Sequence, residues 1–436
     1  MQYSYRRGIL WLIIYFLFSL VPLAVVSSGN VPEYREFWIE FAVALGFIGL
    51  TMFALQFIFT GRLEKIAPTY GMDNLLHFHK EMGIVAFLFV LAHPIILIVV
   101  NSGYLAYFDP SVNLLRAVFL SFASVALIFI MVSSLWRATF RLSYEIWRLI
   151  HGLLSLAIVF IGLAHALQVG HYINTFGKQA VVSILIGGCM YPVIHTRLVR
   201  PWLNRKKPYR VVEVKEERGD AWSIEVEAVG HKKMQHQCGQ FVWLTINDSP
   251  FSLQQHPFSI TSSLNAPNLA FTAKEMGDFT STWKDIKPGD RLFLEGPFGS
   301  FNPLPGKNLF LIMGGIGITP AISMLRTMRD EKDQRKVTLI YGNENLEEAT
   351  FYEELEELNK ELNLQLVHLL TDPPKGWEGE TGKIDREFLE KYLPEDSENY
   401  IYLICGPGPL MDIAEIALKD LGVDWRYIYT ERFKIV

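Results

Sequence analysis

Four histidines lie inside long apolar stretches of this sequence, where ionisable side chains are costly and are usually retained for a function. His79 and His93 occupy one stretch, and His151 and His165 occupy another. In both pairs the second histidine follows the first by 14 residues. On a helix, this spacing puts both members of a pair on one face, roughly 21 Å apart. The separation is too large for one metal site but suits two sites stacked along the helix axis.

The chemistry that these four histidines could support is haem binding. If their two helices run in the same direction, His79 lies level with His151, and His93 lies level with His165. Imidazole nitrogens from two facing helices form a bis-histidine haem iron site, whose lack of an open coordination position favours electron transfer. We therefore expect two b-type haems. The alternative is that buried histidines only bond to neighbouring helices. Zinc is disfavoured because no thiol or carboxylate accompanies the pairs.

The elements that must position these histidines are apolar runs of about 20 residues, the length of a membrane-spanning helix. Six such runs are present, at residues 8–27, 37–60, 79–101, 114–135, 148–168 and 176–199. Residues 1–200 carry 13 Lys and Arg and 8 Asp and Glu, whereas the rest of the chain carries 27 and 37. We expect a transmembrane domain over 1–200, a basic linker over 201–208 and two further domains beyond it.

The loop charges predict how the chain crosses the membrane, because short cytoplasmic loops are enriched in Lys and Arg. One side carries a basic excess, contributed by Arg6, Arg7, Arg62, Lys65, Arg137, Arg141 and the run from Arg197 to Lys207. The other side has none. We therefore expect a multi-pass protein of the plasma (inner) membrane, with both termini and residues 209–436 in the cytosol.

The composition excludes several other classes of protein. Half of the residues are hydrophobic, which rules out a disordered chain. Three widely spaced cysteines, Cys189, Cys238 and Cys405, rule out a disulfide framework. Residues 201–436 are net acidic, which disfavours nucleic-acid binding.

Residues 209–305 show short strand-like runs at close spacing, which indicate a small antiparallel β-barrel. Residues 306–436 show apolar strands alternating with helical stretches, which indicate an α/β domain with a parallel sheet. The first of these strands runs into a glycine-rich turn, Gly314, Gly315, Gly317, Thr319 and Pro320, and then a helix. Such a turn lets a phosphate approach the helix N-terminus, although the glycines alone are also compatible with a plain tight turn.

Several motifs in residues 209–436 resemble the ferredoxin–NADP reductase family. They are Gly239–Phe241, His256–Ser262, Gly277–Thr280, Glu295–Gly299, the Gly314 turn and Cys405–Pro409. With six spans and two histidine pairs, the whole chain resembles the NADPH oxidase and ferric reductase superfamily in its compact bacterial form. The implied fold is a six-helix haem-binding transmembrane bundle followed by a cytosolic reductase module.

The resemblance implies cofactor-binding residues for FAD. The motif that lines the isoalloxazine ring corresponds to His256, Pro257, Phe258, Ser259 and Thr261. The FAD pyrophosphate corresponds to Lys274, Gly277, Phe279 and Thr280, where Lys274 supplies charge and the turn supplies backbone donors.

The resemblance also implies residues for NAD(P)H. The Gly314 turn corresponds to its pyrophosphate loop, and Cys405, Gly406 and Pro407 correspond to the loop beside the nicotinamide. Phe433 corresponds to the aromatic residue that stacks on the flavin, and Glu431 lies near it. Members that select NADPH tend to place an Arg after the second strand of this domain, whereas this sequence has Glu344 there. We therefore expect NADH or dual use.

The function that the resemblance implies is electron transfer from cytosolic NAD(P)H through FAD and two haems to an acceptor outside. Oxygen, giving superoxide, is the first expectation. Ferric or cupric chelate reduction is the alternative, favoured slightly by Leu97, where oxygen-reducing members often carry a His. A third reading is a cytochrome b subunit that serves a partner protein. The roles of Arg116 and His171 near the outer face, and the oligomeric state, are left open.

Overall fold

The computed structural model describes residues 5–62, 72–137, 139–246 and 249–432. Phe433, Lys65 and the side chains of Arg6 and Arg7 lie outside what the structure describes. The chain divides into two compact units between Val199 and Arg200. We call them the helical unit, which ends at Val199, and the sheet unit, which begins at Arg200.

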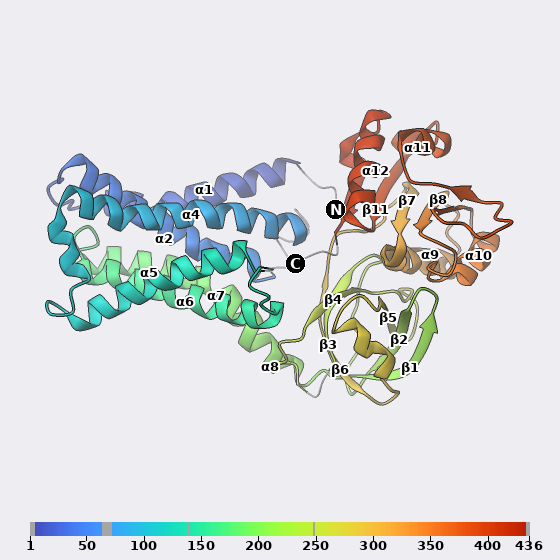
Figure 1. Ribbon diagram of the computed structural model, residues 1–436, viewed down its shortest axis with the longest axis horizontal. Helices are drawn as coiled ribbons and strands as arrows, with labels where there is room; N and C mark the ends of the chain where they lie inside the picture. The colour runs from blue at the N-terminus through green and yellow to red at the C-terminus, as the bar shows by residue number, and fades with distance from the viewer. Residues whose placement is uncertain (1–4, 63–71, 138, 247–248, 433–436) are drawn as a thin grey trace. The chain divides into compact units, whose positions relative to one another are not determined.

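The helical unit consists of long apolar helices (Figure 1). They are α1 (Tyr5–Val26), α2 (Phe37–Thr60), α4 (Met72–Val100), α5 (Leu114–Leu135), α6 (Tyr144–Val169) and α7 (Phe176–Ile194). Among the described residues, six helices are long and apolar enough to cross a membrane. These helices correspond one to one to the six predicted runs, although α4 begins about two turns before the predicted start at residue 79, and the prediction of a multi-pass membrane protein is confirmed.

Local sequence signals set several helix ends in this unit. The side chain of Asn113 accepts a hydrogen bond from the backbone N–H of Arg116 and so caps α5. The side chain of Thr175 caps α7 in the same way through Lys178. Gly170 ends α6 in the left-handed conformation, with φ of 62°, which favours glycine.

Helices α2 and α4 pack closely because α2 presents glycines to α4. A methyl group added at Gly49 would lie 2.7 Å from Val90 Cγ2 and 3.1 Å from the Val90 backbone nitrogen. Small residues that allow such approach are typical of membrane helix interfaces. The side chains that face outward are apolar, and Val99 and Phe160 are 79% and 66% exposed. This surface suits a lipid environment.

The sheet unit begins with α8 (Arg200–Asn204), a short helix that bonds to the first sheet. Arg200 Nη1 lies 3.2 Å from Glu295 Oε1, and Asn204 Nδ2 donates to the carbonyl of Leu294. Both acceptors belong to strand β6 (Arg291–Phe298), so the basic linker is anchored on the sheet that follows it.

The first sheet of this unit is antiparallel and has the strand order β4-β3-β6-β1-β2-β5. Its strands are β1 (Tyr209–Glu217), β2 (Ala221–Ala228), β3 (Phe241–Ile246), β4 (His256–Ser259), β5 (Leu269–Lys274) and β6 (Arg291–Phe298). A bridge between Ile260 and Phe271 joins its two edges, so the sheet is curled as predicted. Its core is apolar and includes the fully buried Trp283.

The second sheet has the order β10-β9-β8-β7-β11-β12 and is parallel throughout. Its strands are β7 (Asn308–Gly314), β8 (Val337–Asn343), β9 (Leu364–Leu370), β10 (Glu380–Thr381), β11 (Tyr400–Cys405) and β12 (Ile428–Glu431). Helices α9 (Thr319–Glu331) and α10 (Tyr352–Glu361) pack on one face, and α11 (Arg386–Tyr392) and α12 (Gly408–Asp420) pack on the other. The predicted α/β fold is confirmed.

Candidate functional site

The four histidines of the helical unit form two facing pairs between α4 and α6. The ring centroids of His79 and His151 are 6.3 Å apart, and those of His93 and His165 are 6.5 Å apart. A metal–imidazole bond of about 2 Å on each side, with each centroid roughly 1 Å behind its nitrogen, corresponds to a separation of about 6 Å. Both pairs are therefore spaced as two axial ligands of one iron would be.

Hydrogen bonds orient one histidine of each pair. His93 Nδ1 lies 2.8 Å from the carbonyl oxygen of Ala42 on α2. A carbonyl only accepts, so Nδ1 carries the hydrogen and the lone pair of Nε2 is left for a metal. His151 Nδ1 lies 3.3 Å from Ser134 Oγ, whose own hydrogen is donated to the carbonyl of Ile130. His151 therefore also carries its hydrogen on Nδ1, which leaves the lone pair of Nε2 for a metal.

The other member of each pair has a buried ring nitrogen that is not satisfied. His79 Nδ1 and His165 Nδ1 have no hydrogen-bond partner among the described residues. Within the same residues, no three His, Cys, Asp or Glu side chains form a group that could hold a metal ion. The donor set is thus two neutral imidazoles per site, which fits haem iron.

A cavity opens beside His93 and His165, and its walls are largely apolar. The residues around it include Gly46, Leu97, Tyr107, His171 and Tyr172. The ring of Tyr107 lies 5.8 Å from that of His165, and the Arg116 guanidinium lies 4.3 Å above Tyr107. Arg116 and His171, whose roles the sequence left open, therefore both belong to the surroundings of the His93–His165 pair.

Two residues in these surroundings carried no sequence signal. Ala42 acts through its backbone carbonyl, and Gly46 acts through the absence of a side chain. A methyl group at Gly46 would lie 2.9 Å from His93 Nδ1. The only hint in the sequence is a series of small residues in an apolar run, which is common to many packed membrane helices.

In the sheet unit, the residues predicted to hold FAD come together at the end of the first sheet. His256 stacks on Phe279 with centroids 4.2 Å apart, and Phe258 lies 4.7 Å from Trp283. Pro257 is accommodated because β4 is an edge strand of the sheet. The hydroxyls of Ser259 and Thr261 are buried and lack a hydrogen-bond partner among the described residues. Buried polar groups normally have partners, so these hydroxyls suit a polar ligand such as FAD.

The residues predicted for the FAD pyrophosphate make other contacts. The Lys274 ammonium forms an ion pair with Glu348. The Thr280 hydroxyl accepts hydrogen bonds from the backbone N–H groups of Met276 and Gly277. A phosphate at this turn would therefore compete with Glu348 for Lys274 and with Thr280 for the two amides.

The predicted nucleotide loops lie side by side at a topological switch point. Strands β7 and β11 are neighbours, and their helices cover opposite faces of the sheet. In open parallel sheets, ligands bind at the carboxyl ends of strands where the order reverses. Gly314, Gly315 and Gly317 follow β7, and Gly406 and Pro407 follow β11.

Glycine is required where these two loops touch. A methyl group at Gly317 would lie 2.5 Å from the carbonyl oxygen of Cys405, and one at Gly406 would lie 3.0 Å from the Gly314 backbone. Thr319 and Pro320 then begin α9, where proline is favoured because the first N–H groups of a helix have no partner within it. The two loops therefore pack against each other beside the start of α9, and the N-terminus of a helix favours an anionic group.

Cys405 and Glu431 lie opposite each other on adjacent strands, at the ends of β11 and β12. Cys405 is fully buried, and burial together with the charge of Glu431 raises the pKa of its thiol well above the ordinary value. The thiol is therefore neutral at physiological pH and is not a nucleophile. A methyl group at Gly299 would lie 3.2 Å from Glu431 Oε1, so Glu431 also borders the Glu295–Gly299 motif.

The segment after β8, predicted to discriminate between NADH and NADPH, is held by backbone bonds. The N–H of Asp372 donates to the carbonyl of Glu344, and that of Thr371 donates to the carbonyl of Asn343. Both side-chain polar atoms of Asn343 are buried and lack a partner among the described residues. The Glu344 side chain is exposed. The exposed charge of this segment is therefore the Glu344 carboxylate, and residues 343–345 include no cation.

Comparison with known families assigns each part of the chain. Residues 45–162 match the family described as ferric reductase like transmembrane component. Residues 207–302 match an FAD-binding domain, and residues 311–415 match an oxidoreductase NAD-binding domain. The chain therefore has the FAD- and NAD-binding domains of an NAD(P)H oxidoreductase.

Individual relatives resemble only part of the chain. An NADH-cytochrome b5 reductase 1 of Debaryomyces hansenii is 32% identical over 183 residues, which cover 41% of this chain and 64% of the relative. A plasma membrane-associated coenzyme Q6 reductase of Saccharomyces cerevisiae is 32% identical over 169 residues, which cover 37% of this chain and 54% of the relative. The chain thus spans between about half and two thirds of the length of these curated relatives.

Among solved structures, a ferredoxin reductase in carbazole 1,9a-dioxygenase matches 52% of this chain and 69% of that chain. The sequence identity is 25% and the TM-score is 0.46.

Proposed function

The chain has the domain architecture of the NADPH oxidase and ferric reductase superfamily, and we propose that it carries electrons across a membrane. In this proposal NAD(P)H is the donor, FAD and two b-type haems are the carriers, and the acceptor binds on the opposite face from the reductase domains.

The observation that carries the proposal is that two histidine pairs, His79 with His151 and His93 with His165, face each other across one apolar helix bundle. With centroid separations of 6.3 and 6.5 Å, each of these pairs would hold one haem iron. The 14-residue offset along α4 and α6 would separate the two proposed haem sites by roughly 21 Å along the helix axes. Two carriers stacked in this way would span much of a hydrocarbon core about 30 Å thick.

The protein's part in the reaction is to place the carriers and tune them. FAD, when bound, would accept a hydride and release electrons singly, and haem iron would relay them. Ala42 and Ser134 would hold the His93 and His151 rings so that Nε2 points at iron. Ser259 and Thr261 would bond the flavin, and the loops around Gly317 and Gly406 would admit the nucleotide.

We propose that both termini and the sheet unit face the cytosol of a cell whose plasma membrane holds the helical unit. This orientation rests on the basic loops, which include Arg137 and Arg141 between α5 and α6. Positively charged loops of this kind are retained on the cytoplasmic side. The His93–His165 pair would then lie toward the outer face.

Oxygen, which one electron reduces to superoxide, is the acceptor we favour. Ferric or cupric chelate is the second candidate, and the observation in its favour is Leu97. This leucine lines the cavity at His93, where a histidine would offer a polar contact to a small oxidant. A cytochrome b subunit that serves a partner protein is the third candidate, and it predicts no turnover with small acceptors.

The acceptor is tested with purified protein that contains haem and FAD. NADH-driven oxygen uptake and superoxide dismutase-sensitive cytochrome c reduction are measured in air, and reduction of a ferric chelate is measured under nitrogen. Oxygen uptake that matches NADH consumption supports the oxidase. Chelate reduction without any oxygen uptake contradicts it.

NADH, or both nucleotides, is the donor we propose. Glu344 would repel the 2′-phosphate of NADPH, and residues 343–345 offer no Arg to bind it. We expect a kcat/KM at least as high for NADH as for NADPH. A Glu344→Arg variant should improve the NADPH value about 10-fold relative to NADH. A strong NADPH preference in the unaltered protein would contradict the assignment.

A further inference from the structure

One face of α9 contacts the backbone that follows the flavin motif. The Ser323 hydroxyl donates to the carbonyl of Ser262 at 2.8 Å. One turn later, Thr327 Oγ1 accepts from the backbone N–H of Leu264 at 3.1 Å. Ser323 and Thr327 are four residues apart, so they share one side of the helix.

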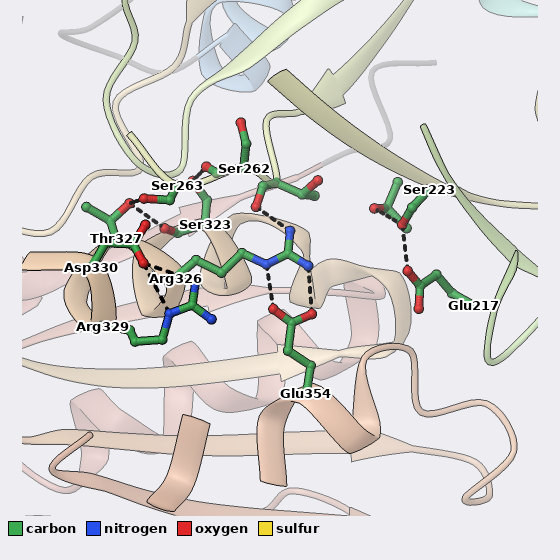
Figure 2. A network of polar contacts seen from close by, with 12 residues as sticks. Glu217, Ser223, Ser262, Ser263, Ser323, Arg326, Thr327, Arg329, Asp330 and Glu354 are labelled. Carbon is green, nitrogen blue, oxygen red and sulfur yellow. Dashed lines mark hydrogen bonds and ion pairs between the residues drawn. The ribbon is translucent and has the colours of Figure 1, made fainter. Parts of the chain in front are cut away.

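Arg326 lies between these two residues and has the most extensive contacts of the three. Its Nη1 donates to the carbonyl of Thr261 at 2.8 Å. Its Nε and Nη2 each donate to one oxygen of Glu354 on α10 at 2.6 Å. Figure 2 shows the guanidinium aligned with the Glu354 carboxylate, one hydrogen bond to each oxygen. The guanidinium also lies 5.2 Å above the ring of Phe351.

This geometry fixes the guanidinium tightly. A bidentate arginine–carboxylate pair is directional as well as strong. The Arg326 side chain is 20% exposed and that of Glu354 is 24% exposed. The third contact, to Thr261, therefore comes from a group whose position is already set within the nucleotide domain.

The same helix begins at the nucleotide loop. Thr319 is the first residue of α9, and Arg326 follows it by seven residues, or about 10 Å. Thr261 lies near the end of the motif predicted to line the isoalloxazine ring. Arg326 thus connects a rigid element that starts at the nucleotide pyrophosphate loop to the end of the flavin motif.

We propose that Arg326 is a positioning residue for hydride transfer, which sets the flavin motif relative to the nucleotide loop. The inference rests on the proposed function, because it requires both cofactors to bind this unit. Displacing reacting groups by about 1 Å can lower a rate about 100-fold. The hydrogen bond from Arg326 to the Thr261 carbonyl would limit such a displacement between the flavin and the nucleotide.

A second set of contacts joins the first-sheet domain to the nucleotide domain and does not involve Arg326. Arg218, at the turn between β1 and β2, donates from Nε to Glu353 at 2.8 Å. The Thr350 hydroxyl donates to the carbonyl of Arg218 at 3.0 Å. Loss of Arg326 should therefore alter the geometry between the domains without separating them.

The experiment uses the full-length protein with FAD and haem, and compares Arg326→Gln with Arg329→Gln. Arg329 lies one turn further along α9 and pairs with its neighbour Asp330 (Figure 2). Its substitution therefore removes the same charge from the same helix without touching the contact to Thr261. Flavin reduction by NADH is followed by anaerobic stopped flow to give the limiting rate and the nucleotide Kd. FAD content and the long-wavelength charge-transfer band of the flavin with bound nicotinamide are measured in parallel.

We expect Arg326→Gln to lower the limiting rate 10- to 100-fold and weaken the charge-transfer band. Its FAD content and NADH Kd should stay within about twofold of the unaltered protein. Arg326→Lys should recover part of the rate, because it can reach one acceptor but not all three. Arg329→Gln should behave as the unaltered protein does.

An unchanged limiting rate in Arg326→Gln would overturn the inference. So would a rate that falls only in proportion to FAD content, since that is the behaviour of a purely structural residue. If the unaltered protein binds FAD but neither NADH nor NADPH reduces it, the proposed function itself fails.

Discussion

Gly46 on α2 lies directly against the imidazole ring of His93 on α4. A methyl group at Gly46 would come within 2.9 Å of Nδ1 and 3.1 Å of Cγ. Four residues earlier on the same helix, the Ala42 carbonyl accepts the Nδ1–H of the same ring. One helix therefore supplies both the hydrogen bond and the space that hold His93 in place.

Gly46→Ala should disturb the site at His93 while the site at His79 stays intact. The added methyl must push the ring away from Ala42, and loss of such an outer partner typically costs 10- to 100-fold in metal-site function. We expect one of two low-spin haem signals in the electron paramagnetic resonance spectrum to shift or disappear. The midpoint potential of that haem should change as well.

Gly49→Ala is the matched control for this prediction. Its methyl would meet Val90 of α4, at 2.7 Å from Cγ2, and would not meet His93. If both variants change the spectrum equally, the effect comes from general packing of α2 on α4, and the specific role of Gly46 is wrong.

The ion pair between Lys274 and Glu348 gives a second prediction. If Lys274 leaves Glu348 to bind the FAD pyrophosphate, Lys274→Gln should weaken FAD binding about 10-fold, because a charged hydrogen bond contributes roughly 1.5–3 kcal/mol. Glu348→Gln removes the competitor, so FAD should bind as tightly as before or more tightly. Fluorescence titration of the flavin measures both.

Lys284→Gln serves as the control, because Lys284 pairs with Glu275 and its side chain is half exposed. The account fails if Glu348→Gln loses FAD as readily as Lys274→Gln does. The ion pair itself would then be what FAD binding requires.

The buried Cys405 thiol predicts how the reaction depends on pH. Burial and Glu431 raise its pKa well above the ordinary value, so the thiol keeps its proton through pH 9. The rate of flavin reduction by NADH should therefore show no step between pH 7 and 9 that is due to this residue. Cys405→Ser should give the same pH profile at a different absolute rate. A step present in the unaltered protein and absent from Cys405→Ser would show that the thiolate takes part.

The features that the sequence predicted well are those with a local pattern. Apolar runs mark membrane helices because the bilayer sets their length. The spacing of His79 and His93 repeats in His151 and His165, so helical periodicity put both members of each pair on one face of their helix, and the common direction of the two spans put the pairs level. The loop from Gly314 to Pro320 was found between its strand and its helix for the same reason.

The features that it could not predict depend on residues far apart in the chain. Lys274 and Glu348 are 74 residues apart, and Arg326 reaches a carbonyl 65 residues earlier. Ala42 contributes only a backbone oxygen, which no side-chain pattern reveals. Such contacts arise when domains and helices pack, and a single sequence carries no periodic trace of them. The roles of Phe433 and of the individual FAD and NAD(P)H residues stay predictions.

The central claim, two haems held by two histidine pairs, is tested most directly by counting b-type haems per chain in the unaltered protein and in His93→Ala. His77→Ala, an exposed histidine on the same helix, is the control. We predict two haems in the unaltered protein and in His77→Ala, and one in His93→Ala. An unaltered protein without two haems, or a His93→Ala protein that retains both, would contradict the account.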